Sequence, residues 1–116
     1  MNQISSGKKK IKYYTADEIL KCGVHEVSDS VMSVAKNWGA LYISVDIDVV
    51  DPAFAPGTGY LESCGISGRE LLLFLSRLRW LKNLVAVDLV EINPNLDPTG
   101  TTVDLGARLI SSFILA

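Results

Sequence analysis

Two apolar runs constrain the fold of this chain more than any other feature of its sequence. Residues 40–45 read ALYISV and residues 84–92 read LVAVDLVEI, so each run is mostly apolar over the length of a strand. Runs of this kind are typical of strands that are buried on both faces of a parallel sheet. Helical patterns precede, separate and follow the two runs, which indicates right-handed crossover connections. The sequence therefore predicts an α/β fold with a parallel sheet.

Capping signals and apolar periodicity predict the helices around these strands. Thr15 with Glu18, and Ser67 with Glu70, have the spacing of a capping box, and Gly23 is placed to end the first helix. The predicted helices span residues 16–22, 28–38, 68–81 and 101–114, and residues 11–14 are expected to form an edge strand.

The length of 116 residues suits one domain, with residues 1–10 expected to be a disordered or flexible tail and residues 11–116 folded. Two strands that need cover on both faces make a poor sheet by themselves. We therefore expect the chain to be part of a larger α/β domain, or to complete its sheet with a partner.

Composition excludes several function classes. A net charge of −2 with 21% charged residues argues against a nucleic-acid or membrane surface. No apolar run reaches the ~18 residues of a membrane span. Cys22 and Cys64 lack metal-binding spacing, so we expect free thiols in a reducing, cytoplasmic compartment.

Acidic residues lie where each apolar run ends. Asp46 and Asp48 end the first run and Glu91 lies near the end of the second, and working residues of α/β sheets lie at the carboxyl ends of strands. Residues two apart in a strand point to the same side, so Asp46 and Asp48 are expected to converge. Converging carboxylates favour a hard divalent cation such as Mg²⁺ or Mn²⁺. Acids that cap a turn or face solvent give the same short pattern, so both interpretations stay open at this point.

We expect most of the remaining charged residues near these motifs to have structural and not catalytic roles. Asp51, before Pro52, is a turn residue. Asp88 lies within the second apolar run and needs a partner, either a hydrogen bond within the site or an arginine. His25 is expected to be an ordinary helix-start or surface histidine. Three arginines of the third helix are expected to be solvated, with a structural pair as the alternative for the first of them: Arg69, Arg77 and Arg79.

Three blocks in order, SVDIDVVDPAFAPGTG, GISGRELL and VAVDLVEINP, resemble the ureohydrolase family of arginases and agmatinases. The resemblance extends from about Tyr14 to the C-terminus, and PAFAPGTG is most similar to the agmatinase branch. It implies a three-layer α/β/α fold with a central parallel sheet, and hydrolysis of a guanidino compound by a pair of Mn²⁺ ions. Agmatine, giving urea and putrescine, is the expected substrate. By resemblance, Asp46 and Asp48 are metal ligands and Glu91 binds the guanidinium group.

The chain departs from the family pattern in ways that shape the expected partners. It resembles only the C-terminal portion, and the upstream GGDHS-like and DAHxD-like ligand blocks do not occur in it. We therefore expect it to be inactive alone and to need a complementary N-terminal half or a homo-oligomer. One alternative is a truncated, non-catalytic assembly or binding module; a weaker one is a simple ion- or nucleotide-binding fragment. Tyr60 and Cys64 replace residues usual in the family, so the resemblance does not fix the substrate.

Overall fold

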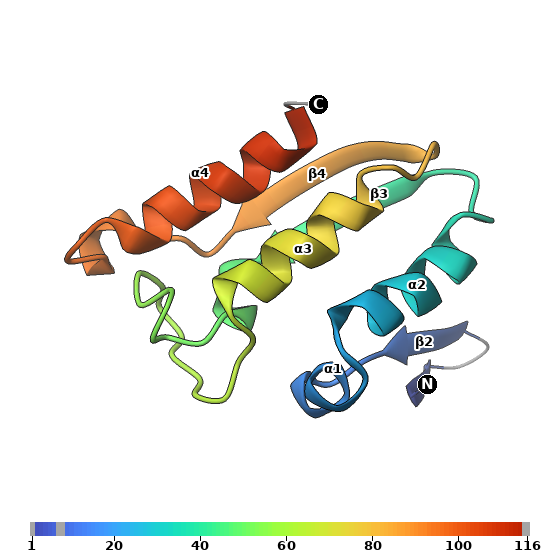
Figure 1. Ribbon diagram of the computed structural model, residues 1–116, viewed down its shortest axis with the longest axis horizontal. Helices are drawn as coiled ribbons and strands as arrows, with labels where there is room; N and C mark the ends of the chain where they lie inside the picture. The colour runs from blue at the N-terminus through green and yellow to red at the C-terminus, as the bar shows by residue number, and fades with distance from the viewer. Residues whose placement is uncertain (1, 7–8, 115–116) are drawn as a thin grey trace.

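The structure is a computed structural model, which describes residues 2–6 and 9–114. In chain order its elements are β1 (Asn2–Ser6), β2 (Lys9–Tyr13), α1 (Ala16–Cys22), α2 (Val24–Ala35), β3 (Leu41–Asp46), the 3-10 helix η1 (Ile47–Val49), α3 (Gly68–Leu78), β4 (Leu84–Val90), the 3-10 helix η2 (Pro94–Leu96) and α4 (Thr101–Ile114) (Figure 1). The order of helices and strands after β2 is the order that the sequence predicts.

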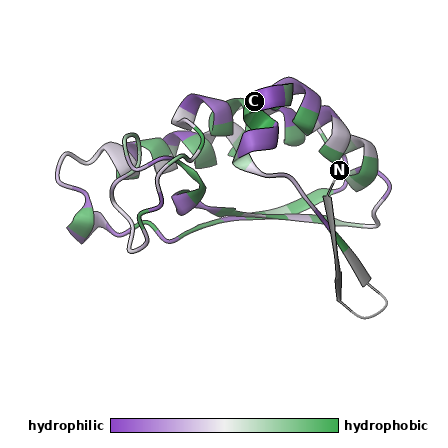
Figure 2. Ribbon diagram, turned by 90° about the horizontal axis from the view of Figure 1, so that it is seen from below, coloured by the Kyte–Doolittle hydropathy of each residue, from purple (hydrophilic) through white to green (hydrophobic). Residues whose placement is uncertain are grey.

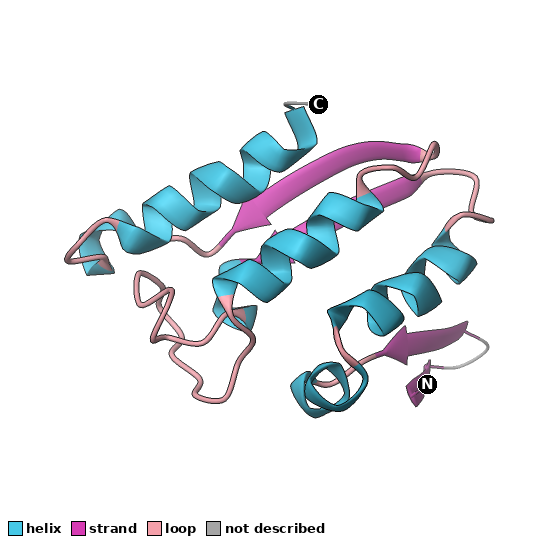
Figure 3. Ribbon diagram, in the orientation of Figure 1, coloured by secondary structure: helices cyan, strands magenta, loops and turns pink. Residues whose placement is uncertain are grey.

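Strands β3 and β4 pair in parallel, which confirms the predicted sheet. Asp46 is opposite Val90 in their register, so the carboxyl ends of both strands lie at one edge. Helices α2, α3 and α4 lie side by side over the same face of this pair (Figures 1 and 3). Figure 2, turned by 90°, shows these helices on one side of the strands, and among the described residues no helix covers the other face. The chain therefore contributes a helix layer and part of a sheet.

A core of apolar side chains joins the helix layer to the sheet. The strands contribute Val45 and the partly buried Ile43 and Leu89. The helices contribute Leu71, Leu75, Leu78 and Leu109, while Ile47, Val50, Ala55 and Ile66 come from the segments that follow β3. The segments that carry the acidic residues are thus packed into the same core as the sheet.

Helix α2 begins and ends about one turn earlier than predicted. Gly23, at φ 85°, both ends α1 and starts α2, so no loop separates the helices. Ser28 was the expected start, but it is buried within the helix and its hydroxyl donates to the His25 carbonyl over 2.9 Å. The capping boxes of α1 and α3 and the bounds of α4 are confirmed.

The strand predicted over residues 11–14 is present as β2, shifted to Lys9–Tyr13. It pairs with β1 in a separate antiparallel hairpin and is not an edge of the β3–β4 sheet, so the edge position was wrong. Much of the expected tail is therefore in strands; Met1, Gly7 and Lys8 lie outside the described residues. Flexibility of residues 1–10 stays a prediction. Within the described ranges, no helix has both the length and the apolar character needed to cross a membrane.

Candidate functional site

The two aspartates after β3 come together through a turn and not through strand alternation. β3 ends at Asp46, and the next residues form η1. The Asp46 carboxylate accepts a hydrogen bond from the Asp48 backbone N–H over 3.1 Å. Ile47 between them is fully buried, so it anchors the turn in the core. The prediction that both acids belong to one strand face was therefore wrong, because Asp48 lies beyond the strand.

Glu91 directly follows β4 and has a left-handed backbone, with φ 72°. In a continued strand, Glu91 would share the face of Leu89, which packs against the core. The left-handed residue breaks this alternation and leaves Glu91 exposed, while Ile92 turns inward against α4. A Cβ added to Gly106 of α4 would lie 2.5 Å from the Ile92 Cδ1 atom, so the missing side chain makes room for that contact.

Asp46 and Glu91 both act electrostatically on Asp48. The pKa of Asp48 is raised, first by desolvation, then by the negative charge of Asp46 and a hydrogen bond with it, and finally by the charge of Glu91. Mutual repulsion of this kind favours either proton uptake or a bound cation. The structure therefore gathers Asp46, Asp48 and Glu91 at the carboxyl ends of two neighbouring parallel strands.

These residues supply only part of a metal site. Carboxylate oxygens are ligands that Mn²⁺ and Mg²⁺ accept. In the part of the chain that the structure describes, no group of three or more His, Cys, Asp or Glu side chains is arranged to hold a metal ion. Asp46 and Asp48 fit as two donors of a larger ligand set, and their role as ligands stays a prediction.

Asp51 organises the loop that follows the acids. Its carboxylate accepts hydrogen bonds from Ala53 N over 2.9 Å, from Cys64 N over 3.0 Å and from Gly65 N over 3.3 Å. The first contact is the turn that the sequence predicts. The other two join both ends of the loop, and sequence reasoning missed them because they link residues 13 and 14 positions apart.

Asp88 finds its partner across the sheet. Ser44 of β3 donates a hydrogen bond from Oγ to Asp88 Oδ1 over 2.6 Å. Of the two partners left open, the structure thus selects a hydrogen bond next to the site and not an arginine. Ser44 lies two residues before Asp46 on the same strand face.

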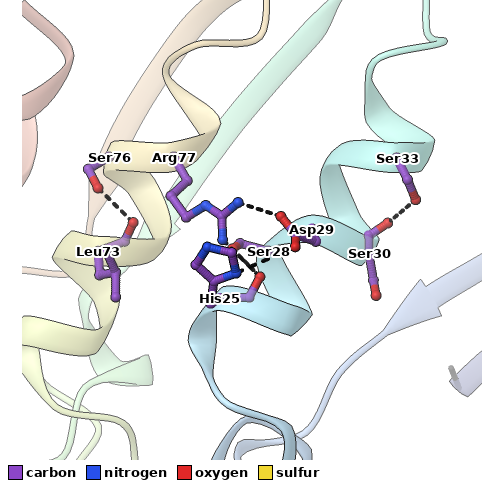
Figure 4. Close-up of polar contacts among 8 residues, drawn as sticks. All are labelled: His25, Ser28, Asp29, Ser30, Ser33, Leu73, Ser76 and Arg77. Atoms are coloured by element: carbon purple, nitrogen blue, oxygen red, sulfur yellow. Dashed lines mark hydrogen bonds and ion pairs between the residues drawn. The ribbon is translucent and has the colours of Figure 1, made fainter.

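Two of the arginines join neighbouring helices of the layer, and Figure 4 shows Arg77 beside His25 and Asp29. Arg77 of α3 pairs with Asp29 of α2 and donates to the His25 carbonyl over 3.0 Å. Arg79 donates to the Ser112 carbonyl of α4 over 2.6 Å. Both are partly buried, so the expectation that they are solvated was wrong; Arg69 is exposed. His25 is exposed near the start of α2, as expected.

The sequence and structure of this chain are similar to those of known proteins of one family. The model of the arginase family matches residues 2–116. An agmatinase from Halalkalibacterium halodurans is 34% identical over 97% of this chain, and proclavaminate amidinohydrolase from Streptomyces clavuligerus is 38% identical over 91% of it. The crystal structure of Entamoeba histolytica arginase superposes on 89% of the chain with a TM-score of 0.82 and 32% identity.

The chain belongs to the arginase family of ureohydrolases, and it has part of the arginase fold. The predicted family and fold class are therefore confirmed. The chain spans only 40% of the Halalkalibacterium protein, 34% of the Streptomyces protein and 35% of the Entamoeba arginase chain.

Proposed function

We propose that this chain supplies two metal ligands and the substrate acid to an agmatinase-like amidinohydrolase. In this proposal Asp46 and Asp48 hold part of a binuclear Mn²⁺ centre, and Glu91 binds the guanidinium group of agmatine. The observation that carries it is the gathering of these three acids at the ends of β3 and β4, where the charges of Asp46 and Glu91 help to raise the pKa of Asp48. The products would be urea and putrescine, in a cytoplasmic step of polyamine synthesis.

The exposed position of Glu91 suits the binding of a planar cation. A carboxylate can accept two parallel hydrogen bonds from the forked N–H groups of a guanidinium. The Mn²⁺ pair, when bound, would lower the pKa of a bound water towards neutrality. Asp46 and Asp48 would orient that centre, and Glu91 would hold the carbon of the guanidinium group beside it.

The proposed partner is the portion of the arginase fold that this chain does not span, supplied in a longer protein or as a separate chain. A homo-oligomer of the completed protein is the further expectation. Support comes from the share of each relative that the chain covers, about 40% or less. It also comes from the apolar side chains that the sheet exposes, with Tyr42 at 58%, Val85 at 69% and Val90 at 38% exposure.

The test is urea release from agmatine, with arginine as the competing substrate, by the chain joined to or mixed with the N-terminal portion of an agmatinase. We expect Mn²⁺-dependent activity that Asp46→Asn, Asp48→Asn and Glu91→Gln each abolish. Asp104→Asn is the matched control, because Asp104 is an exposed acid of α4. Absence of urea from any guanidino compound, at any Mn²⁺ concentration, would refute the proposal.

A second candidate is a non-catalytic assembly module, which the same exposed apolar side chains of β3 and β4 favour. Two measurements together distinguish the candidates: light scattering coupled to size-exclusion chromatography, and the urea assay. A module gives a stable complex without urea release, whereas the amidinohydrolase gives both. A well-folded monomer that binds no partner would contradict both candidates.

A further inference from the structure

Glu91 has a backbone conformation that needs an explanation beyond its own sequence position. Among the described residues, Glu91 and Cys64 are the non-glycine residues with positive φ. A side chain in this region is strained, and such residues persist only where their surroundings over-determine them. The residues that follow Glu91 are paired with a loop, and that loop is in turn hydrogen-bonded to the start of α4.

The first restraint is a short antiparallel pairing with the loop of residues 51–65, which follows the two aspartates and is called the site loop below. Thr58 forms an isolated bridge with Ile92, and Asn93 N–H donates to the Gly57 carbonyl over 2.8 Å. The chain therefore changes its pairing partner from β3 to the site loop within two residues of the end of β4. Glu91 lies between these two pairings, so its left-handed backbone is at the point where the partner changes.

The second restraint fixes that loop to the start of α4. Gly57 N–H donates to the Thr102 hydroxyl oxygen over 2.8 Å, and Thr102 is fully buried. The Thr102 backbone N–H in turn donates to the Asp97 carboxylate over 3.2 Å. A Cβ on Gly57 would lie 2.6 Å from Asp97 Cβ and 2.9 Å from Thr102 Oγ1, so the loop lies against these residues without spare space.

We propose that Thr102 is a positioning residue for Glu91. Its hydroxyl fixes Gly57, Gly57 fixes Asn93, and this pairing imposes the left-handed turn that directs the Glu91 side chain outward. The consequence for substrate rests on the proposed function, in which Glu91 binds the guanidinium group. The consequence for the backbone does not, because it concerns this chain alone.

The test measures the φ angle of Glu91 by NMR three-bond couplings and residual dipolar couplings in the isotopically labelled chain. Thr102→Val keeps the shape of the side chain but removes the oxygen, and we expect Glu91 to leave the left-handed region. Thr102→Ser keeps the oxygen and should restore the wild-type angle. Thr101→Val, at the exposed neighbouring position, is the matched control. A folded Thr102→Val chain with Glu91 still near the wild-type angle would overturn the proposal.

A double-mutant cycle gives a second readout that a general packing role would not produce. Glu91→Gly relieves the strain, so it should raise the folding equilibrium constant about fivefold in the wild-type chain. In the Thr102→Val background this gain should disappear, because the strain is already released. An equal gain in both backgrounds means that Thr102 does not impose the turn.

One measurement needs no variant, in case Thr102→Val does not fold. In native-state hydrogen exchange of the wild-type chain, the Gly57 and Asn93 amides should open with the same free energy, since one network holds both. Exchange of Asn93 that is many-fold faster than that of Gly57 would contradict the proposal.

In the assembled amidinohydrolase, Thr102→Val should raise KM for agmatine more than it lowers kcat. No urea release by the assembled wild-type protein, together with the expected φ change in Thr102→Val, would refute the proposed function and leave the positioning role intact.

Discussion

Gly65 is the position where one added methyl group most directly tests the packing of the site loop. A Cβ there would lie 2.7 Å from Asp51 N and 2.7 Å from Val49 O. Both atoms belong to the pairing with Ile66, in which Asp51 N–H donates to Ile66 O over 2.8 Å and Ile66 N–H donates to Val49 O over 3.1 Å. Because the neighbours are backbone atoms and not flexible side chains, Gly65→Ala must push the two segments apart.

The expected cost follows from these contacts. Each of the two backbone hydrogen bonds contributes about 1 kcal/mol, and overpacking a closed site costs about 1–3 kcal/mol. Alanine restricts the unfolded chain and returns about 0.4–1 kcal/mol. The free energy of unfolding should therefore fall by about 3 kcal/mol, which corresponds to a Tm lower by about 12 °C for a chain of 116 residues.

Urea denaturation followed by far-UV circular dichroism measures this change. Gly39→Ala is the matched control, because a Cβ at Gly39 meets nothing within 4 Å and the residue has no positive φ. That variant should be more stable than the wild type by about 0.4–1 kcal/mol. A Gly65→Ala chain with the wild-type midpoint and m-value would refute the steric reasoning, as would equal losses in both variants.

Three further changes test the loop, the start of α4 and the helix layer. Cys64→Gly should raise the free energy of unfolding by about 0.5–1 kcal/mol, because glycine is unstrained at φ 67°; Cys64→Ala, which removes only the thiol, should not. Burial raises the pKa of Asp97, but hydrogen bonds from the Val103 and Thr102 amides and from the Thr102 hydroxyl outweigh it, so the pKa is lowered. Ionised Asp97 therefore adds stability above about pH 4, and this stability is lost as the pH falls through the lowered pKa. Asp97→Asn should make the free energy of unfolding, measured by urea titrations at a series of pH values, fall less steeply below about pH 4. An unchanged pH dependence would contradict the role given to Asp97. Arg77→Met should cost about 1 kcal/mol in thermal unfolding, whereas Arg108→Met, in an exposed pair with Asp104, should cost under about 0.5 kcal/mol; equal losses would contradict the role of Arg77.

Much of the fold could be predicted because its signals are local. The capping boxes at Thr15 and Ser67 each need residues three positions apart, and both are present. The two apolar runs likewise indicate the parallel pair, whose strands the structure places at β3 and β4. The position of the acids at strand ends follows from the same pattern.

The features that could not be predicted depend on contacts between distant residues. Glu91 has no local signal for a left-handed backbone, since its turn is set by Gly57 and α4. Arg77 reads as a surface residue until α2 is packed beside α3. The left-handed backbone of Cys64, in contrast, had a signal in the sequence. The family that the chain resembles usually has Gly-Gly where this chain has Cys64-Gly65, and glycine is the residue that such a backbone favours.

The start of α4 is completed by residues outside the helix. Asp97 accepts hydrogen bonds from the backbone N–H groups of Thr102 and Val103, and Gly57 reaches Thr102 from 45 positions earlier in the chain. The backbone partners of the first turn are therefore local, and α4 can begin to form before any distant contact is made. The hydroxyl of Thr102 gains its partner Gly57 only when a long chain segment closes, so this end of α4 should become fully ordered after the rest of the helix has formed.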